Sequence, residues 1–294
     1  MRNRGHWIAI LCAAALTLGY CSGPLGDWRM RRIEEPMFQP VSAEAREEYV
    51  GLFREVWHRR GYDITSEMWQ SVGFDADRTV DNYDWYLELS ERSGGRNGLG
   101  SYLLRYGVHS SILLEAPHSD DDLYTGRIVR NLFLTGFYAG AGFNSLSRWS
   151  VDRQARYGDF TRREDTAFAA FAVAFLAENP GGTVIQIHGF DTEKRGEASF
   201  ADADIVVSEG TDAPSPRTHA LCDCLNRLLP ARVLLYPKDT RELGGTRNAT
   251  GKIVRQGGGY FLHLELSLNF RNRLRRDSVL TDRFDACLDG TWPP

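Results

Sequence analysis

Leu113-Leu-Glu-Ala-Pro-His-Ser-Asp-Asp-Asp122 places an apolar run directly before a histidine and a set of carboxylates. Two later stretches, Thr183-Val-Ile-Gln-Ile-His-Gly-Phe190 and Tyr260-Phe-Leu-His-Leu-Glu-Leu-Ser267, also carry a histidine in or near the second half of an apolar run. Such short runs are consistent with buried strands, and ligand sites in α/β sheets lie beyond the carboxyl ends of strands. The pattern therefore predicts a metal site that contains His118 and His188.

Strands and helices are predicted to alternate from residue 100 onward. We expect strands over 101–106, 110–116, 136–143, 183–190, 204–208, 232–236 and 259–267, and helices over 121–135, 164–178 and 216–229. This alternation predicts an α/β fold with a mixed, mostly parallel sheet and helices on both faces.

The composition limits the class of partner. The chain has 294 residues and a formal net charge of −4, and residues 1–21 contain arginines but no acid, so the remainder is more acidic still. Phosphate binding requires a basic surface stripe, and we therefore expect no nucleic-acid partner. The length favours one large domain.

The N-terminus has the pattern of an export signal. A basic start precedes the apolar run Trp7–Tyr20, which is short for a membrane span. We expect residues 1–21 to direct export to the periplasm or cell envelope, and a retained N-terminal anchor is the alternative. Cys21 is a candidate lipidation site, although the bulky Tyr20 precedes it.

Three further segments complete the expected organisation. Residues 22–41 contain prolines and are interpreted as a linker. A helix is predicted over 42–60, because Ser42 can cap it and Gly61 can end it. The stretch 62–99 is weakly patterned, so residues 42–99 are interpreted as an N-terminal extension and 100–294 as the α/β domain.

The predicted export has a consequence for the cysteines. In an oxidising environment, Cys222 or Cys224 is expected to pair with Cys287 and to hold the C-terminal segment. Three unpaired thiols are the alternative.

The carboxylates after the first histidine are candidate metal ligands. Asp121 and Asp122 follow His118 by three and four residues, so either can reach its imidazole, and a charged helix start is the alternative. His188 shares a strand face with Gln186, and a structural histidine bonded to a carbonyl is the alternative reading.

The last strand supplies the predicted base. His263 and Glu265 are two residues apart, so their side chains share one face of the strand. A glutamate among leucines is costly to bury without a cation or a donor. We therefore predict Glu265 as the general base, with a salt bridge to Arg271 or Arg273 as the alternative, and His263 as a substrate contact or third metal ligand.

These residues suit one zinc ion, which lowers the pKa of a bound water while a glutamate accepts the proton. Arg148 and Arg271 are candidates for holding a substrate carboxylate or an oxyanion. The glycine-rich segment 242–251 is expected to form a flexible rim of the site. No G-x-S-x-G, Walker A or H-E-x-x-H motif is present.

Taken in order, the motifs resemble the N-formylglutamate amidohydrolase-like family, within the zinc carboxypeptidase-like superfamily. The resemblance spans about residues 100–275 and rests on Glu115-Ala-Pro-His118 with Asp122 and Thr125, Gln186-Ile-His-Gly-Phe190, Gly244–Asn248, and His263-Leu-Glu-Leu-Ser267 with Arg271. It implies a zinc carboxypeptidase-like fold.

The resemblance also implies roles for individual residues. His118, Asp121 or Asp122, and His188 would bind the metal, Glu265 would act as the base, and Arg148, Asn248 and Arg271 would lie near the substrate. The expected function is an exported zinc-dependent hydrolase of amide or peptide bonds. Its substrate would be a small molecule or peptide that carries a carboxylate. A catalytically inactive envelope binding protein on the same fold is the alternative.

Overall fold

The computed structural model describes residues 38–58, 65–81, 84–92, 97–107, 109–149, 158–197 and 200–290. Its strands are β1 (Phe74–Asp81), β2 (Asp84–Glu91), β3 (Ser101–Arg105), β4 (Ile112–Ala116), β5 (Gly140–Phe143), β6 (Thr183–Phe190), β7 (Ile205–Ser208), β8 (Val233–Leu235) and β9 (Tyr260–Ser267). Its helices are α1 (Ala43–His58), α2 (Ser66–Ser71), α3 (Thr125–Thr135), α4 (Ala167–Glu178), α5 (Pro216–Leu228), α6 (Ala249–Gln256), α7 (Leu268–Leu274) and α8 (Ser278–Asp289), with short 3₁₀ turns η1 (Phe160–Arg162) and η2 (Thr192–Lys194).

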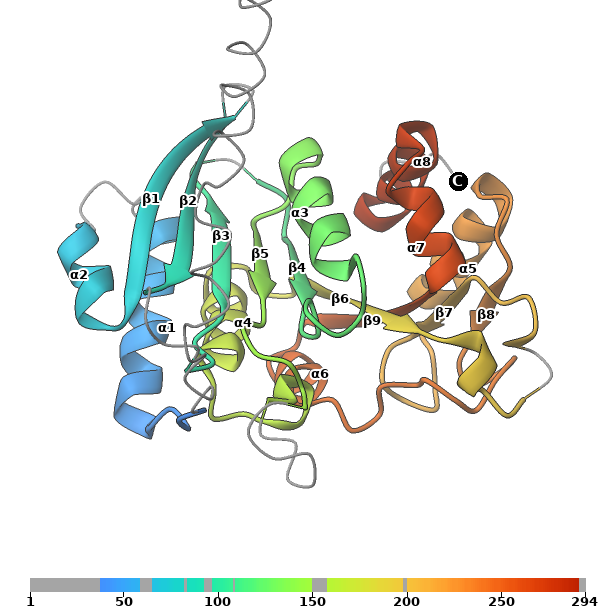
Figure 1. The fold of residues 1–294 in the computed structure, drawn as a ribbon, viewed down its shortest axis with the longest axis horizontal. Coiled ribbons are helices and arrows are strands. Elements are labelled where there is room, and N and C mark those ends of the chain that lie inside the picture. Colours follow the sequence, from blue (N-terminus) through green and yellow to red (C-terminus); the bar gives the residue numbers. More distant parts are fainter. Residues whose placement is uncertain are drawn as a thin grey trace, which may run out of the picture. The chain divides into compact units, whose positions relative to one another are not determined.

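The strands form one mixed sheet in the order β1-β2-β3-β5-β4-β6-β9-β7-β8 (Figure 1). Strands β5, β4, β6 and β9 pair in parallel, as do β7 and β8. The pairs on the β1 side and the β7–β9 pair are antiparallel. The predicted α/β class and mixed sheet are confirmed, and the parallel block is the part that carries the predicted histidines.

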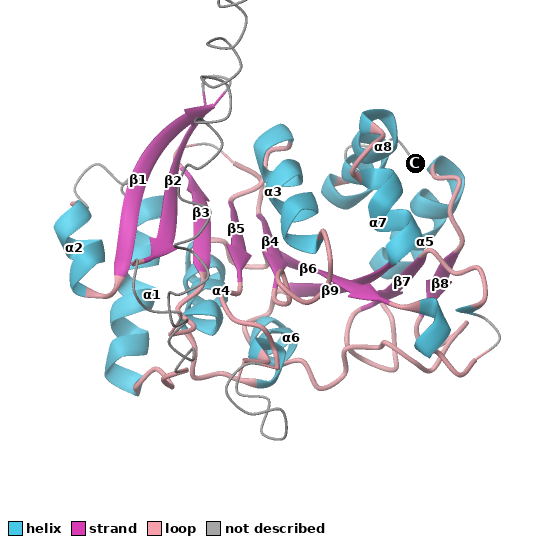
Figure 2. Cartoon of the chain, in the orientation of Figure 1, coloured by secondary structure: helices cyan, strands magenta, loops and turns pink. Residues whose placement is uncertain are grey.

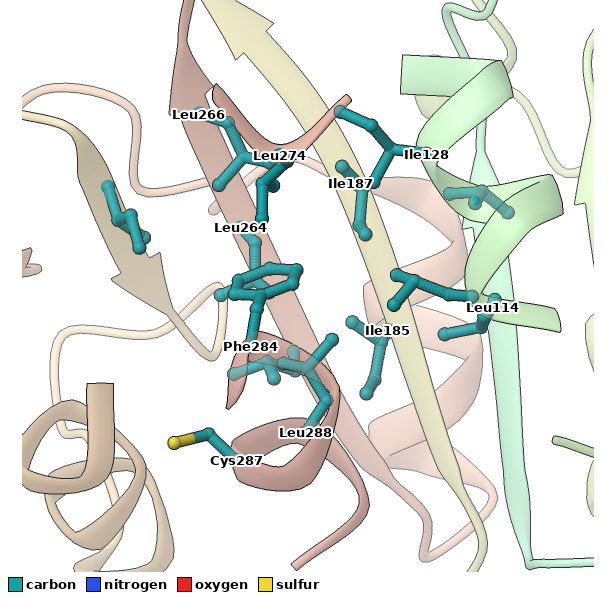
Figure 3. Close-up of a cluster of buried hydrophobic side chains, with 14 of the residues drawn as sticks. Leu114, Ile128, Ile185, Ile187, Leu264, Leu266, Leu274, Phe284, Cys287 and Leu288 are labelled. Carbon is teal, nitrogen blue, oxygen red and sulfur yellow. The ribbon is translucent and has the colours of Figure 1, made fainter. Parts of the chain in front are cut away.

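Helices cover both faces of the sheet, as predicted (Figure 2). Alternate residues of each central strand point to opposite faces. Leu114, Ile185 and Leu264 pack with α3, α5, α7 and α8, part of which is shown in Figure 3. Leu113 and Val184 belong to the other apolar layer, with α1, α4 and α6. Apolar residues on both strand faces therefore explain the nearly continuous apolar runs in the sequence.

Residues 62–99, for which the sequence indicated no role, contribute α2 and the hairpin of β1 and β2 to the described structure. The hairpin extends the sheet through the pairing of β2 with β3. Its strands include charged residues such as Asp77 and Arg78, so they lack the apolar run that marks the central strands. Helix α1 packs on the same layer, where the Phe53 and Phe171 rings are 4.9 Å apart.

Several predicted boundaries are corrected. The helix expected over 121–135 begins at Thr125, because residues 117–124 form a turn in which Tyr124 has a φ of 75°. The glycine-rich segment 242–251 runs directly into α6, which Asn248 caps.

In the described part of the chain, no helix combines the length and apolar character needed to cross a bilayer. The predicted export signal over 1–21, with Cys21, and most of the 22–41 linker lie outside the described residues.

A disulfide joins Cys224 to Cys287, which confirms one of the two predicted pairings. It links α5 to α8 across 63 residues of sequence. Cys222 is a buried free thiol. The bridge therefore anchors the last described helix to the layer that covers β7 and β9.

Removing this bridge should lower stability. The Cys224→Ala/Cys287→Ala variant is expected to lose about 2–4 kcal/mol of unfolding free energy, because a disulfide restricts the unfolded chain. Urea unfolding with and without reductant measures the change, and Cys222→Ala, which leaves the bridge intact, is the matched control. A wild-type unfolding curve that reductant does not shift would contradict the assignment.

Candidate metal centre

A cleft of about 1000 Å³ opens at the carboxyl ends of β4, β6 and β9. It is lined by all of the residues that the sequence nominated, namely His118, Asp121, Asp122, Arg148, His188, Asn248, His263, Glu265 and Arg271. The parallel pairing of the central strands brings these residues together from distant parts of the chain.

Three ligand atoms converge in this cleft. His118 Nδ1 lies 3.2 Å from His188 Nδ1, and Asp122 Oδ2 lies 3.5 Å and 3.8 Å from those two nitrogens. Zinc bonds of about 2.0–2.2 Å in a tetrahedral site place neighbouring ligand atoms roughly 3.4 Å apart. His118, Asp122 and His188 therefore have the spacing of a metal-binding group.

The other nitrogen of each ring is also engaged. His118 Nε2 lies 3.0 Å from Asp159 Oδ1, and His188 Nε2 lies 3.2 Å from Gln186 Oε1. Carboxylate and amide oxygens only accept, so each Nε2 donates, and the neutral rings present Nδ1 lone pairs to each other. Such outer partners are characteristic of metal-binding histidines. The donor set therefore fits a metal ion.

The pKa values of the two histidines shift in opposite directions. Burial acts to lower the pKa of His118, but its hydrogen bonds to Asp122 and Asp159 outweigh burial and raise it. Burial, followed by the charges of His263 and His118, lowers the pKa of His188 well below its usual range. His118 is therefore the more basic of the two rings.

The two aspartates have different partners. Asp121 accepts hydrogen bonds from the Ser147 hydroxyl at 2.6 Å and from the Arg148 backbone N–H at 2.7 Å. Asp122 Oδ1 contacts the Arg148 guanidinium, and its Oδ2 accepts the Gly189 N–H at 2.9 Å. Burial would raise the pKa of Asp122, but its hydrogen bond and ion pair with His118 help to lower it. Asp122 thus faces the two histidines, whereas Asp121 orients the segment around Arg148.

Glu265 and His263 form a second group with His188. Glu265 pairs in register with His188, and His263 Nε2 lies 3.8 Å from Glu265 Oε1. Burial, followed by the charge of Asp122, raises the pKa of Glu265 to about 8, while burial lowers that of His263 to about 4. His263 is therefore a neutral imidazole near neutral pH, and it is the alternative third ligand.

Arg271 holds the ends of the strands together. Its guanidinium donates to the backbone carbonyls of Leu123, Phe190 and Leu266. A Cβ at Gly189 would lie 2.5 Å from the guanidinium carbon, so a larger residue there would require Arg271 to shift. Arg271 also lines the cleft, and its contact with substrate stays a prediction.

Sequence reasoning missed the contact of Asp159 with His118 and the hydrogen-bond partner of Glu115. Asp159 lies 41 residues beyond His118 and is buried beside it, where it also accepts from the Thr161 hydroxyl. No spacing in the sequence points to this pairing. Glu115 is fully buried and accepts the Gln186 amide N–H at 2.7 Å. A signal for it existed, because a glutamate inside an apolar strand requires a polar partner.

No family model and no curated protein matches the chain. Among solved structures, it is similar to an N-formylglutamate amidohydrolase from Ralstonia eutropha JMP134, with 12% identity and a TM-score of 0.44 over 65% of this chain and 94% of that one. It is also similar to a gene product of Agrobacterium tumefaciens, with 14% identity and a TM-score of 0.44 over 62% and 92%.

A candidate metallopeptidase from Shewanella amazonensis SB2B is similar at 14% identity, with a TM-score of 0.35 over 79% of this chain and 91% of that one. The Ralstonia protein carries the name of the family that the sequence motifs resemble. Identities this low carry no information about substrate or mechanism.

The two aspartates should respond differently to substitution. If Asp122 is a metal ligand, Asp122→Ala is expected to weaken zinc binding by more than the roughly 10–100-fold typical of losing a hydrogen-bond partner of a ligand. Asp121→Ala is expected to retain bound zinc. Competition with a chromogenic chelator gives both affinities, and His263→Ala measured alongside tests the alternative ligand. The assignment fails if His263→Ala loses more affinity than Asp122→Ala.

Glu115 should make stability depend on pH. Burial raises its pKa from 4.5 to about 8, so the folded chain keeps a proton that the unfolded chain releases. Its contribution to stability is full below pH 4.5 and is lost as the pH rises through about 8. The unfolding free energy of Glu115→Gln relative to wild type should therefore increase with pH, as urea titrations across this range would show. A constant difference would contradict burial of an ionisable carboxyl here.

Proposed function

We propose that the chain is a zinc-dependent hydrolase of amide or peptide bonds. The observation that carries the proposal is the convergence of His118 Nδ1, His188 Nδ1 and Asp122 Oδ2 beside the buried carboxyl of Glu265. His118, His188 and Asp122 would hold the ion. When bound, zinc supplies Lewis-acid chemistry, since it lowers the pKa of a water and polarises a carbonyl.

Glu265 is the proposed general base. Its raised pKa matches a group that first accepts a proton from water and then returns it to a leaving amine near neutral pH. The neighbouring His263 ring is uncharged, so it neither pairs with the carboxylate nor removes its basicity. Glu265 is therefore the group to which we assign proton transfer.

The lining of the cleft supports a substrate with a carboxylate. Arg148, Arg195, Arg241 and Arg247 all line it, and Arg241 and Arg247 are exposed. Guanidinium groups bind carboxylates through paired, charge-assisted hydrogen bonds. Arg148 is already close to Asp122, so it is the cation best placed to stabilise charge near the reacting carbonyl.

The proposed location is the periplasm or cell envelope. The Cys224–Cys287 bridge supports it, because structural disulfides persist in oxidising compartments. The basic start and short apolar run within residues 1–21 support an export signal, and Cys21 is the proposed lipid attachment point. Mass mapping of protein recovered from the source cell would locate the mature N-terminus.

Mutations should distinguish the proposed base from the proposed metal ligands. Glu265→Gln is expected to keep zinc and to lose on the order of 10²–10⁴-fold in rate, because it removes only the proton acceptor. His118→Ala and His188→Ala should lose zinc as well as activity. The assay is a panel of N-acyl amino acids and small peptides, with zinc content measured on each variant.

Near-wild-type turnover by a folded Glu265→Gln variant would reject the base. Zinc binding without hydrolysis of any substrate in the panel would instead favour a binding protein. Absence of bound zinc after loading would reject the proposed function itself.

A further inference from the structure

A row of buried polar side chains crosses the sheet beneath the cleft. Glu115, Gln186 and His263 stand in register on β4, β6 and β9, and each is at most 4% exposed. The preceding residues on the same face, such as Leu113 and Val184, are apolar. Buried polar groups in such a layer require definite partners. Glu115 and Gln186 meet this requirement through a hydrogen bond to each other, whereas His263 Nδ1 has no hydrogen-bond partner among the described residues.

The orientation of this row begins at the N-terminus of α6. The Gly251 backbone N–H donates to Asn248 Oδ1 at 3.0 Å. A backbone N–H cannot accept, so the Asn248 amide must direct its NH₂ group the other way, where it donates to Gln186 Oε1 at 2.6 Å. The oxygen of Gln186 is thereby assigned, and its own NH₂ group donates to Glu115 Oε2 at 2.7 Å.

The same oxygen of Gln186 faces His188. It lies 3.2 Å from His188 Nε2, so this nitrogen must carry the proton. His188 Nδ1, which faces His118 and Asp122, is then left with its lone pair. We infer that the chain of Asn248, Gln186 and Glu115 sets the tautomer of His188, so that the N-cap of α6 decides which ring nitrogen is offered to the metal.

Asn248 and Gln186 are positioning residues in this arrangement. In this inference they act on the metal through His188, and no atom of Glu115 needs to reach the cleft. The tautomer can be measured on metal-free protein, whereas the effect on zinc affinity rests on the proposed function. The two readouts therefore separate a failure of this inference from a failure of the zinc assignment.

Asn248→Asp is the decisive variant. Aspartate caps a helix as well as asparagine does, so α6 and the fold should be retained. The NH₂ donor is replaced by an acceptor, and Gln186 must rotate to present its NH₂ group to the new carboxylate. His188 Nε2 then faces a donor, and ¹⁵N NMR of the metal-free protein should show the proton moving from Nε2 to Nδ1.

Zinc affinity of Asn248→Asp, measured by chelator competition, should fall about 10–100-fold, as for other changes in the partners of metal-binding histidines. Simple electrostatics predicts the opposite sign, because the variant adds a negative charge near a cation. A wild-type tautomer in the variant would overturn the inference, whether or not zinc binds. Unchanged or tighter zinc binding would overturn its consequence for the metal.

A matched pair at Gln186 gives an independent test, including the case in which Asn248→Asp does not fold. Gln186→Glu keeps an acceptor for both Asn248 and His188, and it should preserve the Nε2–H tautomer. Gln186→Met has a similar volume but no acceptor, so the preference for Nε2–H should be lost and zinc binding weakened. Identical tautomers in the two Gln186 variants would refute the inference.

Discussion

Two imidazole rings that face each other through acceptor nitrogens define the site. His118 Nδ1 and His188 Nδ1 are 3.2 Å apart, and the second nitrogen of each ring is directed to Asp159 or Gln186. Lone pairs this close repel in a buried place, where water does not screen them. A proton or a metal ion must therefore lie between the rings. The nearby carboxylate of Asp122 favours a cation, which makes the arrangement suitable for a divalent metal.

The sheet supplies the rigidity that this contact requires. Parallel pairing of β6 with β9 places Glu265 opposite His188, and the pairing of β4 with β6 brings His118 to the same edge. Arg271 then joins the ends of these strands through carbonyl hydrogen bonds and packs against Gly189. Backbone register thus sets the spacing of His188, His263 and Glu265, while the turn after β4 carries His118 and Asp122.

Buried ionisable groups near the site are expected to lower the stability of the core. Glu115, His263 and Glu265 are buried groups whose charged forms are disfavoured, as their shifted pKa values show. In Glu115 one carboxyl oxygen has no hydrogen-bond partner among the described residues, and the same holds for His263 Nδ1. Apolar layers on both sides of the sheet offset such costs, since most other inward side chains of the central strands are leucine, isoleucine, valine or phenylalanine.

The sequence by itself determined the central strands, their histidines and Glu265, because alternation along a strand is a local property that a short stretch records. It also limited the candidates for a third metal ligand to Asp121, Asp122 or His263. Tertiary structure alone decided that Asp122 faces His118 and His188, while Asp121 binds the Arg148 segment. It also decided that the charged β1–β2 hairpin pairs with the sheet and that Asp159 contacts His118. Those contacts join residues far apart in the chain, and only the packing of the whole sheet brings them within bonding distance.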